Sequence, residues 1–381
     1  MEKIRIGLDG RALGNINRTR GIGRYTAHLL ANLAEAGDRY RFVLFAYGSE
    51  PQDDLEIRPL LDRMEWREIP RPGKISLLSL PYEHLLFARA VDAAQVDLFH
   101  AIDHNMTPFA ATPFTLTVHD LIPLVMRGPY LGPTAWLWMQ AHRLAARRAR
   151  AVVAVSDSTR RDVQRLWGIP DHRIVVIPEG VSDLYRPVEE RAAAETAARY
   201  GIERPYFLYL GGFDPRKNVH TMLLSFKRFA LKGNGAHKLV LCGDSRGFEG
   251  YLEDEIEELG LRGMVVSTGF VPEEDLPALL SGATLLICIS LYEGFGLPLL
   301  EAMACGTPVL ASNLSSIPEV VGDAGILVNP LDPNQIVAGM EELAYNKKRR
   351  EECIKKGLRR SAAFTWRETA RRTLDLFDRM L

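Results

Sequence analysis

Several well-known catalytic motifs are absent from this 381-residue sequence. It has no GxxxxGKS or GxxxxGKT segment, which argues against a P-loop ATPase, and no HExxH segment, which argues against a zinc protease of that type. No DxD triplet occurs either, so a site that clamps a divalent metal through paired aspartates lacks its usual ligands. Any anionic ligand would have to be met by cationic side chains and backbone N–H groups instead.

Cysteine and long apolar runs are also scarce. The chain has four cysteines and no CxxC pair, so we expect reduced, mostly buried thiols, as in a cytosolic protein. The opening MEKIRIGLDG lacks the apolar run of a signal peptide. The longest uncharged run, Leu276 to Tyr292, contains Pro277 and Gly282 and is shorter than the about 20 apolar residues of a membrane span. These features predict a soluble, cytoplasmic protein.

No charge of one sign dominates. Lysine and arginine number 47 against 48 aspartates and glutamates, for a net charge of -1. This balance argues against a general nucleic-acid-binding protein. With 381 residues, 47% of them hydrophobic, the chain is long enough for two domains, each with its own core.

Short apolar, β-branched runs alternate with helix-like segments and predict the fold class. There are six runs in each half: 4–9, 41–47, 96–101, 114–120, 151–156 and 174–180, then 206–212, 238–243, 264–270, 285–290, 307–312 and 325–329. Such runs are typical of parallel strands buried on both faces. We therefore expect an α/β protein with two Rossmann-like, doubly wound domains, 1–185 and 186–365, with the boundary in the polar linker 183–190. The last amphipathic segment, 364–381, either closes the second domain or crosses back to the first.

The segment EGFGLPLLE (293–301) holds two glutamates in an apolar part of the chain. Between Leu276 and Pro318 they are the only charged residues, although 25% of all residues are charged. In one continuous helix they would lie about 12 Å apart along the axis and about 80° apart around it. Pro298 suits a first helical turn, so we expect Glu301 inside a helix and Glu293 in the loop before it. The N–H groups of 294–297 could then face an anion. The alternative is two exposed charges.

Two further segments carry glycines directly after, or soon after, predicted strands. GGFDPRKN (211–218) places Arg216 and Lys217 where a helix should begin, an unfavourable position for cations unless a polyanion binds there. RTRGIGRYT (18–26) contains Gly21 and Gly23, but Thr26 occupies the place of the third glycine of a dinucleotide fingerprint. The first segment favours a phosphate site. The second is either an anion-facing loop or a plain turn.

Polar residues at other strand ends, and one basic helix, are further candidates. His119 and Asp120 in TVHDLIP (117–123) either cap the structure or line a cleft, and His104 and Asn105 follow an earlier strand. Residues 135–152 contain four arginines and two tryptophans, a pattern typical either of a helix at a membrane surface or of a solvated helix face.

Together these segments resemble the retaining glycosyltransferases of the GT-B fold, specifically the group-1 family, GT4. Glu293 and Glu301 match the family's glutamate–seven–glutamate motif, GGFDPRKN matches its diphosphate-binding segment, and residues 315–325 match a segment near the nucleotide. GIGRYT and HDLIP match first-domain segments, although many members carry two adjacent glycines where this chain reads GIGRY. In relatives the C-terminal helix returns to the first domain.

The resemblance implies transfer of a hexose from a nucleotide diphosphate sugar, with retention and without a metal or other cofactor. It implies that Glu301 binds the ribose, that Glu293 and His119 lie at the donor sugar, and that Arg216 and Lys217 stabilise the leaving diphosphate. Further implied donor contacts are Gly21, Gly23, Gly212, Gly294, Phe295, Gly296 and Leu297. The acceptor-side candidates are Arg24, His104, Asn105 and Asp120. The second domain would hold the donor and the first the acceptor.

GIGRY and HDLIP are similar to segments of bacterial mannosyl- and rhamnosyltransferases of surface polysaccharide (O-antigen) synthesis. The resemblance favours GDP-mannose, with UDP- and dTDP-sugars as alternatives. It also implies a glycan or polyprenyl-diphosphate-linked acceptor, reached by peripheral contact of 135–152 with the anionic inner face of the membrane. Competing hypotheses are a nucleotide-sugar 2-epimerase of the same architecture, an NAD-dependent dehydrogenase and a non-catalytic binding module.

Overall fold

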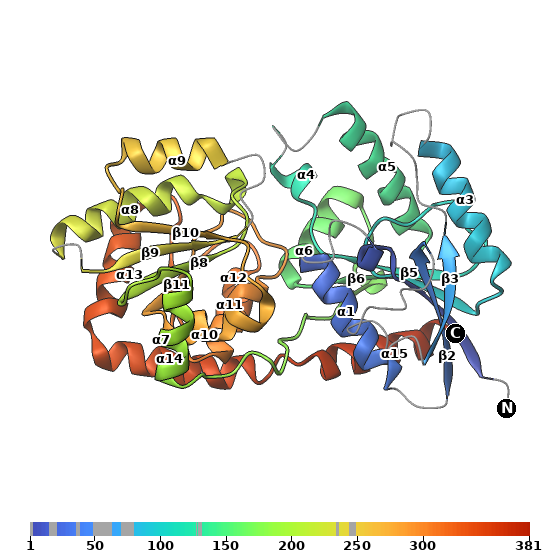
Figure 1. The fold of residues 1–381 in the computed structure, drawn as a ribbon. Helices are drawn as coiled ribbons and strands as arrows, with labels where there is room; N and C mark the ends of the chain where they lie inside the picture. The colour runs from blue at the N-terminus through green and yellow to red at the C-terminus, as the bar shows by residue number, and fades with distance from the viewer. Residues whose placement is uncertain are drawn as a thin grey trace. The chain divides into compact units, whose positions relative to one another are not determined.

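The computed structural model describes residues 3–14, 21–35, 39–48, 63–69, 80–126, 128, 132–233, 236–243 and 249–381. The chain divides into two compact units (Figure 1): unit 1 is Met1–Glu179 with Trp366–Leu381, and unit 2 is Gly180–Thr365. The division falls between Glu179 and Gly180, a few residues before the linker in which the sequence places the boundary.

Unit 1 is built on a seven-stranded sheet in the order β3-β2-β1-β4-β5-β6-β7. Every pairing in it is parallel. The strands are β1 (Ile4–Asp9), β2 (Tyr40–Tyr47), β3 (Met64–Ile69), β4 (Leu98–Ala101), β5 (Phe114–Val118), β6 (Ala151–Ala154) and β7 (Ile174–Val176). The helices are η1 (Arg11–Gly14), α1 (Gly21–Ala34), α3 (Leu80–Ala93), α4 (Ile122–Met126), α5 (Pro133–Arg148), α6 (Asp157–Asp162), η3 (Val163–Trp167), η4 (Asp171–Arg173) and α15 (Trp366–Met380).

The strand count predicted for the first half is wrong by one, because β3 was missed. Its sequence, MEWREI, places Glu65, Arg67 and Glu68 at intermediate or exposed positions. The strand lies at the edge of the sheet, where it pairs only with β2 among the described strands. An edge strand is not buried on both faces, so it lacks the continuous apolar run that identifies the central strands.

Unit 2 carries a six-stranded parallel sheet in the order β10-β9-β8-β11-β12-β13. Its strands are β8 (Tyr206–Leu210), β9 (Lys238–Cys242), β10 (Val265–Gly269), β11 (Leu285–Cys288), β12 (Val309–Ser312) and β13 (Ile326–Val328). Its helices are α7 (Glu190–Arg199), η5 (Pro215–Lys217), α8 (Val219–Lys232), α9 (Glu249–Glu258), η6 (Glu273–Asp275), α10 (Leu276–Gly282), α11 (Leu297–Ala304), α12 (Ile317–Val321), α13 (Pro333–Tyr345) and α14 (Lys347–Ser361). All six strands predicted for this half are confirmed.

Both sheets therefore have the doubly wound strand order, in which chain direction across the sheet reverses between β1 and β4 and between β8 and β11. Ligands of such sheets bind outside the carboxyl ends of the strands at that switch point. The two cores are formed by apolar side chains of the central strands and of the helices on them, for example Phe99 and Leu116 in unit 1 and Leu239 and Ile287 in unit 2.

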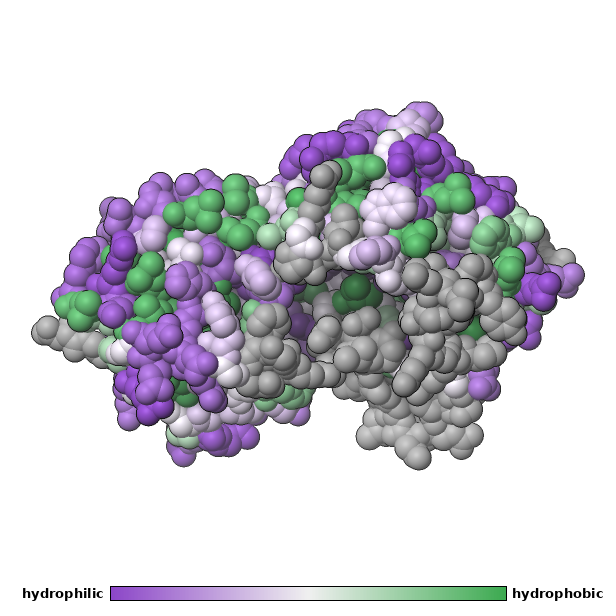
Figure 2. Space-filling model, turned by 90° about the horizontal axis from the view of Figure 1, so that it is seen from above, coloured by the Kyte–Doolittle hydropathy of each residue, from purple (hydrophilic) through white to green (hydrophobic). Residues whose placement is uncertain are grey.

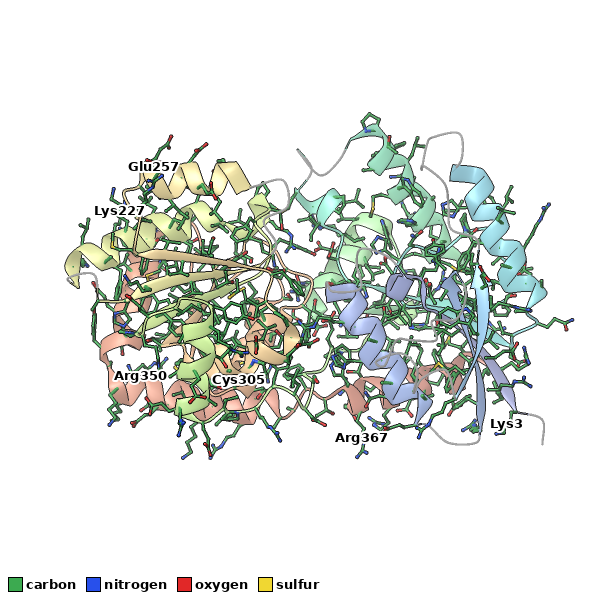
Figure 3. The ribbon with its side chains drawn as sticks, viewed as in Figure 1. Lys3, Lys227, Glu257, Cys305, Arg350 and Arg367 are labelled. Atoms are coloured by element: carbon green, nitrogen blue, oxygen red, sulfur yellow. The ribbon has the colours of Figure 1, made fainter. Side chains whose placement is uncertain are left out.

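The C-terminal helix α15 belongs to unit 1, so the prediction that it crosses back to the first domain is confirmed. It lies beside α1 (Figure 1). Its buried residues are Trp366, Thr369, Ala370, Thr373, Leu376 and Phe377, spaced along one face of the helix. The four cysteines are free and buried, as predicted; Figure 3 labels Cys305 among the side chains of unit 2.

Candidate active site

Arg216 and Lys217 follow β8 and lie in the short helix η5, just before α8. Asn218 separates the two helices and has a left-handed φ of 58°. Its side-chain amide donates to the carbonyl of Ile289 at 3.3 Å, and Leu291 N–H donates to the carbonyl of Arg216 at 2.7 Å. These bonds tie the loop after β8 to the loop after β11, which are the two strands at the switch point.

Glu293 lies in that second loop and contacts both cations. Its Oε1 accepts from Lys217 Nζ at 2.6 Å, and its Oε2 accepts from Arg216 Nη1 at 2.7 Å. Ser290 Oγ also donates to Oε1 at 2.6 Å. Arg216 Nε lies 3.0 Å from Asp214 Oδ1, so the guanidinium bridges two carboxylates. The result is a compact charged cluster at the carboxyl ends of β8 and β11.

The cluster is buried enough to perturb ionisation. Glu293 is 9% exposed. Burial alone would raise its pKa, but the charges of Lys217 and Arg216 and the hydrogen bonds from Lys217 and Ser290 lower the pKa to about 2. Glu293 is therefore an anion at neutral pH, held between two cations.

Backbone contacts fix the Glu293 loop in front of α11. Ser315 Oγ accepts the Glu293 N–H at 3.0 Å. Ser316 Oγ lies 2.9 Å from the carbonyl oxygen of Glu293 and 2.8 Å from that of Phe295, so its single O–H is shared between the two. Gly296 precedes the helix with φ 120°, a conformation that residues with a Cβ rarely adopt. The chain can therefore turn sharply here and present the first N–H groups of α11, which lack acceptors within the helix.

Glu301 lies inside α11 and is 1% exposed, whereas Glu293 lies outside that helix. The predicted division of the two glutamates between loop and helix is confirmed, and the alternative of two exposed charges is wrong. Pro298 occupies the first turn of α11 as expected.

In unit 1, His119 follows β5 and is 6% exposed. Its Nδ1 lies 3.2 Å from Glu179 Oε1, and its Nε2 lies 3.0 Å from the carbonyl oxygen of Ile102. The edge of the Tyr25 ring packs on the imidazole at a centroid distance of 4.5 Å. His119 is thus held from the ends of several strands.

The other candidate residues lie in α1, in the loop after β8 and in the loops after β4 and β5. Gly21, Gly23 and Arg24 form the first turn of α1. Gly212 follows β8, and its carbonyl accepts from the Tyr209 hydroxyl. The remaining three residues make contacts within unit 1. His104 Nδ1 lies 2.9 Å from Asp103 Oδ1, the Asn105 carbonyl accepts a hydrogen bond from Arg11, and Asp120 Oδ1 accepts one from the Ile122 N–H at 3.0 Å.

Sequence reasoning missed Ser290, Ser316 and Glu179, which contact the predicted residues directly. Ser290 follows the buried strand β11 and Glu179 follows the edge strand β7, and both strands were predicted from the sequence, so the rule that singled out His119 at a strand end could have found them. Ser316 lies in the segment 315–325 that the resemblance includes, but its hydrogen bonding to the Glu293 loop requires the folded chain.

Comparisons with known proteins show the family to which the chain belongs. The family described as glycosyl transferases group 1 matches residues 195–360, and glycosyltransferase family 4 matches residues 19–183. The O-antigen chain mannosyltransferase B of Escherichia coli is 35% identical over 94% of this chain and 95% of that protein. This chain belongs to the group 1 glycosyltransferases.

Two further proteins are similar to this chain at lower sequence identity. The MMP alpha-(1->4)-mannosyltransferase of Mycolicibacterium hassiacum is 28% identical over 95% of each chain. The solved sucrose-phosphate synthase of Thermosynechococcus elongatus superposes with a TM-score of 0.79 at 22% identity, covering 99% of each chain. The predicted GT-B fold of this glycosyltransferase is confirmed.

The basic segment of this glycosyltransferase is α5 together with Arg150 just after it, and three of its four arginines donate to backbone carbonyls of unit 1. Arg143 Nε donates to the Trp167 carbonyl at 3.2 Å, Arg148 donates to the carbonyls of Pro108 and Ala110, and Arg150 donates to that of Met380. Its exposed apolar side chains are Trp136, Leu137 and Leu144. Figure 2, which looks onto this side, shows hydrophobic side chains interspersed with hydrophilic ones.

Among the described residues, no helix is long and apolar enough to cross a membrane. No group of three or more His, Cys, Asp or Glu side chains in the same residues could hold a metal ion.

Proposed function

We propose that this glycosyltransferase transfers mannose from GDP-mannose to a glycan or polyprenyl-diphosphate-linked acceptor, with retention of configuration and without a metal ion. Unit 2 binds the nucleotide sugar and unit 1 the acceptor. The observation that carries the proposal is the contact of Glu293 with Arg216 and Lys217 at the switch point of unit 2. Mannose is proposed because two of the similar proteins are mannosyltransferases.

The proposed chemistry uses the cluster as follows. Negative charge develops on the diphosphate as the glycosidic bond breaks, and Arg216, Lys217 and the first N–H groups of α11 stabilise it. Glu293 accepts hydrogen bonds from hydroxyls of the donor sugar. Glu301, one turn into α11, accepts hydrogen bonds from the ribose. The two cations thus supply the positive charge that a metal ion supplies in DxD enzymes.

The donor half of the proposal is tested with labelled nucleotide sugars. Incubation with GDP-mannose should release GDP and label an acceptor, and EDTA should leave the rate unchanged. UDP- and dTDP-sugars should react much more slowly. Conversion of the donor to an epimer, without GDP release, would instead indicate an epimerase.

The cations are tested by Arg216→Ala and Lys217→Ala, each of which should reduce the transfer rate by about 100-fold or more, as for loss of a group that stabilises transition-state charge. Lys227→Ala is a matched control. Lys227 lies on α8 and is labelled on the outside of unit 2 in Figure 3. An equal loss in the control would contradict the assignment.

We further propose that α5 brings unit 1 to the anionic membrane surface where a lipid-linked acceptor would lie. The support is the exposure of Trp136 (50%) and Leu144 (50%) beside arginines on one helix. Binding to phosphatidylglycerol vesicles should weaken in Trp136→Gln and Leu144→Gln and fall with salt. Leu331→Gln in unit 2, where Leu331 is 67% exposed, is the control. Vesicle binding that is unchanged in both α5 variants would refute the proposed contact of α5 with the membrane.

A further inference from the structure

The imidazole of His119 faces two hydrogen-bond acceptors. Glu179 Oε1 lies 3.2 Å from Nδ1, and the carbonyl oxygen of Ile102 lies 3.0 Å from Nε2. A neutral imidazole carries one N–H and can donate to only one acceptor, which leaves its lone pair facing the other oxygen. A doubly protonated imidazolium donates to both. The geometry therefore favours the cation, with Glu179 as its counter-ion.

Burial strengthens this preference. The side chains of His119 and Glu179 are 8% and 7% exposed, so water cannot easily replace either partner. An unpaired buried charge is costly, whereas a hydrogen-bonded pair is compensated. Burial alone would lower the pKa of His119, but the hydrogen bond and charge of Glu179 and the charge of Asp103 raise it above its ordinary value.

Other titratable groups face the ring from neighbouring elements. They are Asp103 and His104 after β4, His100 on β4 and Tyr25 on α1. Asp103 raises the pKa of His104 against the effect of burial, so these two form a second ion pair. Burial lowers the pKa of His100 to about 3, so it stays neutral. Glu179 is then the anion that balances the charge of His119.

Glu179 also occupies a structurally fixed place. It is the last residue of unit 1 before the chain passes into unit 2. The preceding residue, Pro178, accepts a hydrogen bond from Thr369 Oγ1 of α15 at 2.8 Å. Trp366, the first residue of α15, packs on Tyr25 at 5.4 Å, whereas its neighbour Arg367 extends into solvent (Figure 3). Pro178 and Tyr25 therefore link the start of α15 to Glu179 and His119 within unit 1.

We propose that Glu179 is a positioning residue that holds His119 as an imidazolium with its ring fixed between the loops after β4 and β7. Glu179 itself touches no substrate. The consequence for catalysis rests on the proposed function, with His119 at the donor as the family resemblance implies: a cationic His119 favours the negative charge that develops on the leaving diphosphate, and it cannot act as a general base.

The protonation state is tested directly by NMR of the nine histidine side chains, with the His119 signals assigned through His119→Asn. At about pH 7.5, roughly one unit above the ordinary histidine pKa, wild-type His119 should still give the doubly protonated spectrum. Glu179→Gln should give the neutral one, and Glu179→Asp should recover part of the charged form. A neutral His119 in the wild type, or the same titration in Glu179→Gln, would overturn the proposal.

The second readout is the pH profile of transfer. The required form is the cation, which is present below the His119 pKa and lost above it, so lowering that pKa should remove activity first at high pH. Glu179→Gln should therefore lose about tenfold or more of kcat near pH 8 and recover much of it near pH 6, since each pH unit above a pKa reduces the cation about tenfold. An equal loss at all pH values would indicate a merely structural role and refute this step.

Glu255→Gln is the matched control, because Glu255 is also a buried carboxylate paired with a histidine, His220, but lies on α9 in unit 2. Its pH profile should follow the wild type. If no donor is consumed at any pH, the proposed function fails, while the NMR titration still decides the state of His119.

Discussion

Replacing Glu293 with glutamine should change donor binding and transfer in opposite directions. The Glu293 carboxylate contacts Lys217 at 2.6 Å and Arg216 at 2.7 Å, so an incoming diphosphate competes with it for both cations. Glutamine removes the competing charge. It also removes the acceptor that we propose for the sugar hydroxyls. We expect Glu293→Gln to bind the nucleoside diphosphate more tightly and to transfer sugar more slowly.

The structure bounds the gain in affinity. The pKa of Glu293 is lowered from 4.5 to about 2, so at about 1.4 kcal/mol per pKa unit its surroundings favour the carboxylate by about 3 kcal/mol. Ser290 supplies part of this, and a diphosphate can share the cations rather than displace Glu293. We therefore expect a gain of about 1.4 kcal/mol, or about tenfold in Kd.

Isothermal titration calorimetry with GDP, and in parallel UDP, measures this gain, and initial rates with GDP-mannose measure the loss. Glu255→Gln, which removes a buried carboxylate of unit 2 outside the cluster, should change neither. Weaker GDP binding by Glu293→Gln, comparable with that of Arg216→Ala, would refute the competition, because it would mean that Glu293 holds the cations in place for the diphosphate.

Further predictions concern the stability of the site and of each unit. Because the folded pKa of Glu293 is depressed, its contribution to stability is complete above about pH 4.5 and should disappear as the pH falls toward 2; hydrogen exchange in α11 should accelerate over that range in the wild type and not in Glu293→Gln. Ser316→Ala removes the hydroxyl that is hydrogen-bonded to the Glu293 loop, so it should destabilise that loop by about 1–3 kcal/mol. The effect should be seen as faster amide hydrogen exchange at 293–297, and unchanged exchange would mean that the hydroxyl does not stabilise the loop. Trp366→Ala should lower the free energy of unfolding of unit 1 by about 3–5 kcal/mol. Unfolding is followed by the fluorescence of the remaining tryptophans, all of which belong to unit 1, and an unchanged unfolding transition would show that α15 packs on unit 1 without Trp366. The four buried thiols should resist Ellman's reagent until the chain is unfolded, and rapid modification of the native protein would contradict their burial.

The central strands could be predicted because each is buried on both faces and reads as one apolar run. The edge strand β3 could not, since Glu65, Arg67 and Glu68 interrupt its apolar residues at intermediate or exposed positions. The position of Glu293 before α11 also followed from local chemistry: Pro298 marks a helix start, and two carboxylates eight residues apart cannot meet on one helix. Those predictions needed only the neighbouring residues.

The partners of the site residues needed the tertiary fold. Nothing near Glu179 in the sequence indicates that it contacts His119, 60 residues earlier. The arginines of residues 135–152 form a pattern that a membrane-facing helix and a solvated helix face share. In the structure, Arg143 and Arg148 of α5 and Arg150 just after it donate to carbonyls from other parts of unit 1, a use of arginine that only the packing against the helix reveals.

The contact between Glu293 and the Arg216–Lys217 pair is a consequence of strand order. The two loops are 76 or 77 residues apart in sequence, yet they meet because β11 pairs directly with β8. If another strand lay between β8 and β11, the same two loops would be separated along the sheet edge. An anion in an apolar segment and two cations at the start of a helix are each unfavourable alone. The doubly wound strand order brings these opposite charges together. The same order leaves the first turn of α11 beside them, so a diphosphate placed there would meet both cations and helix N–H groups at one strand edge.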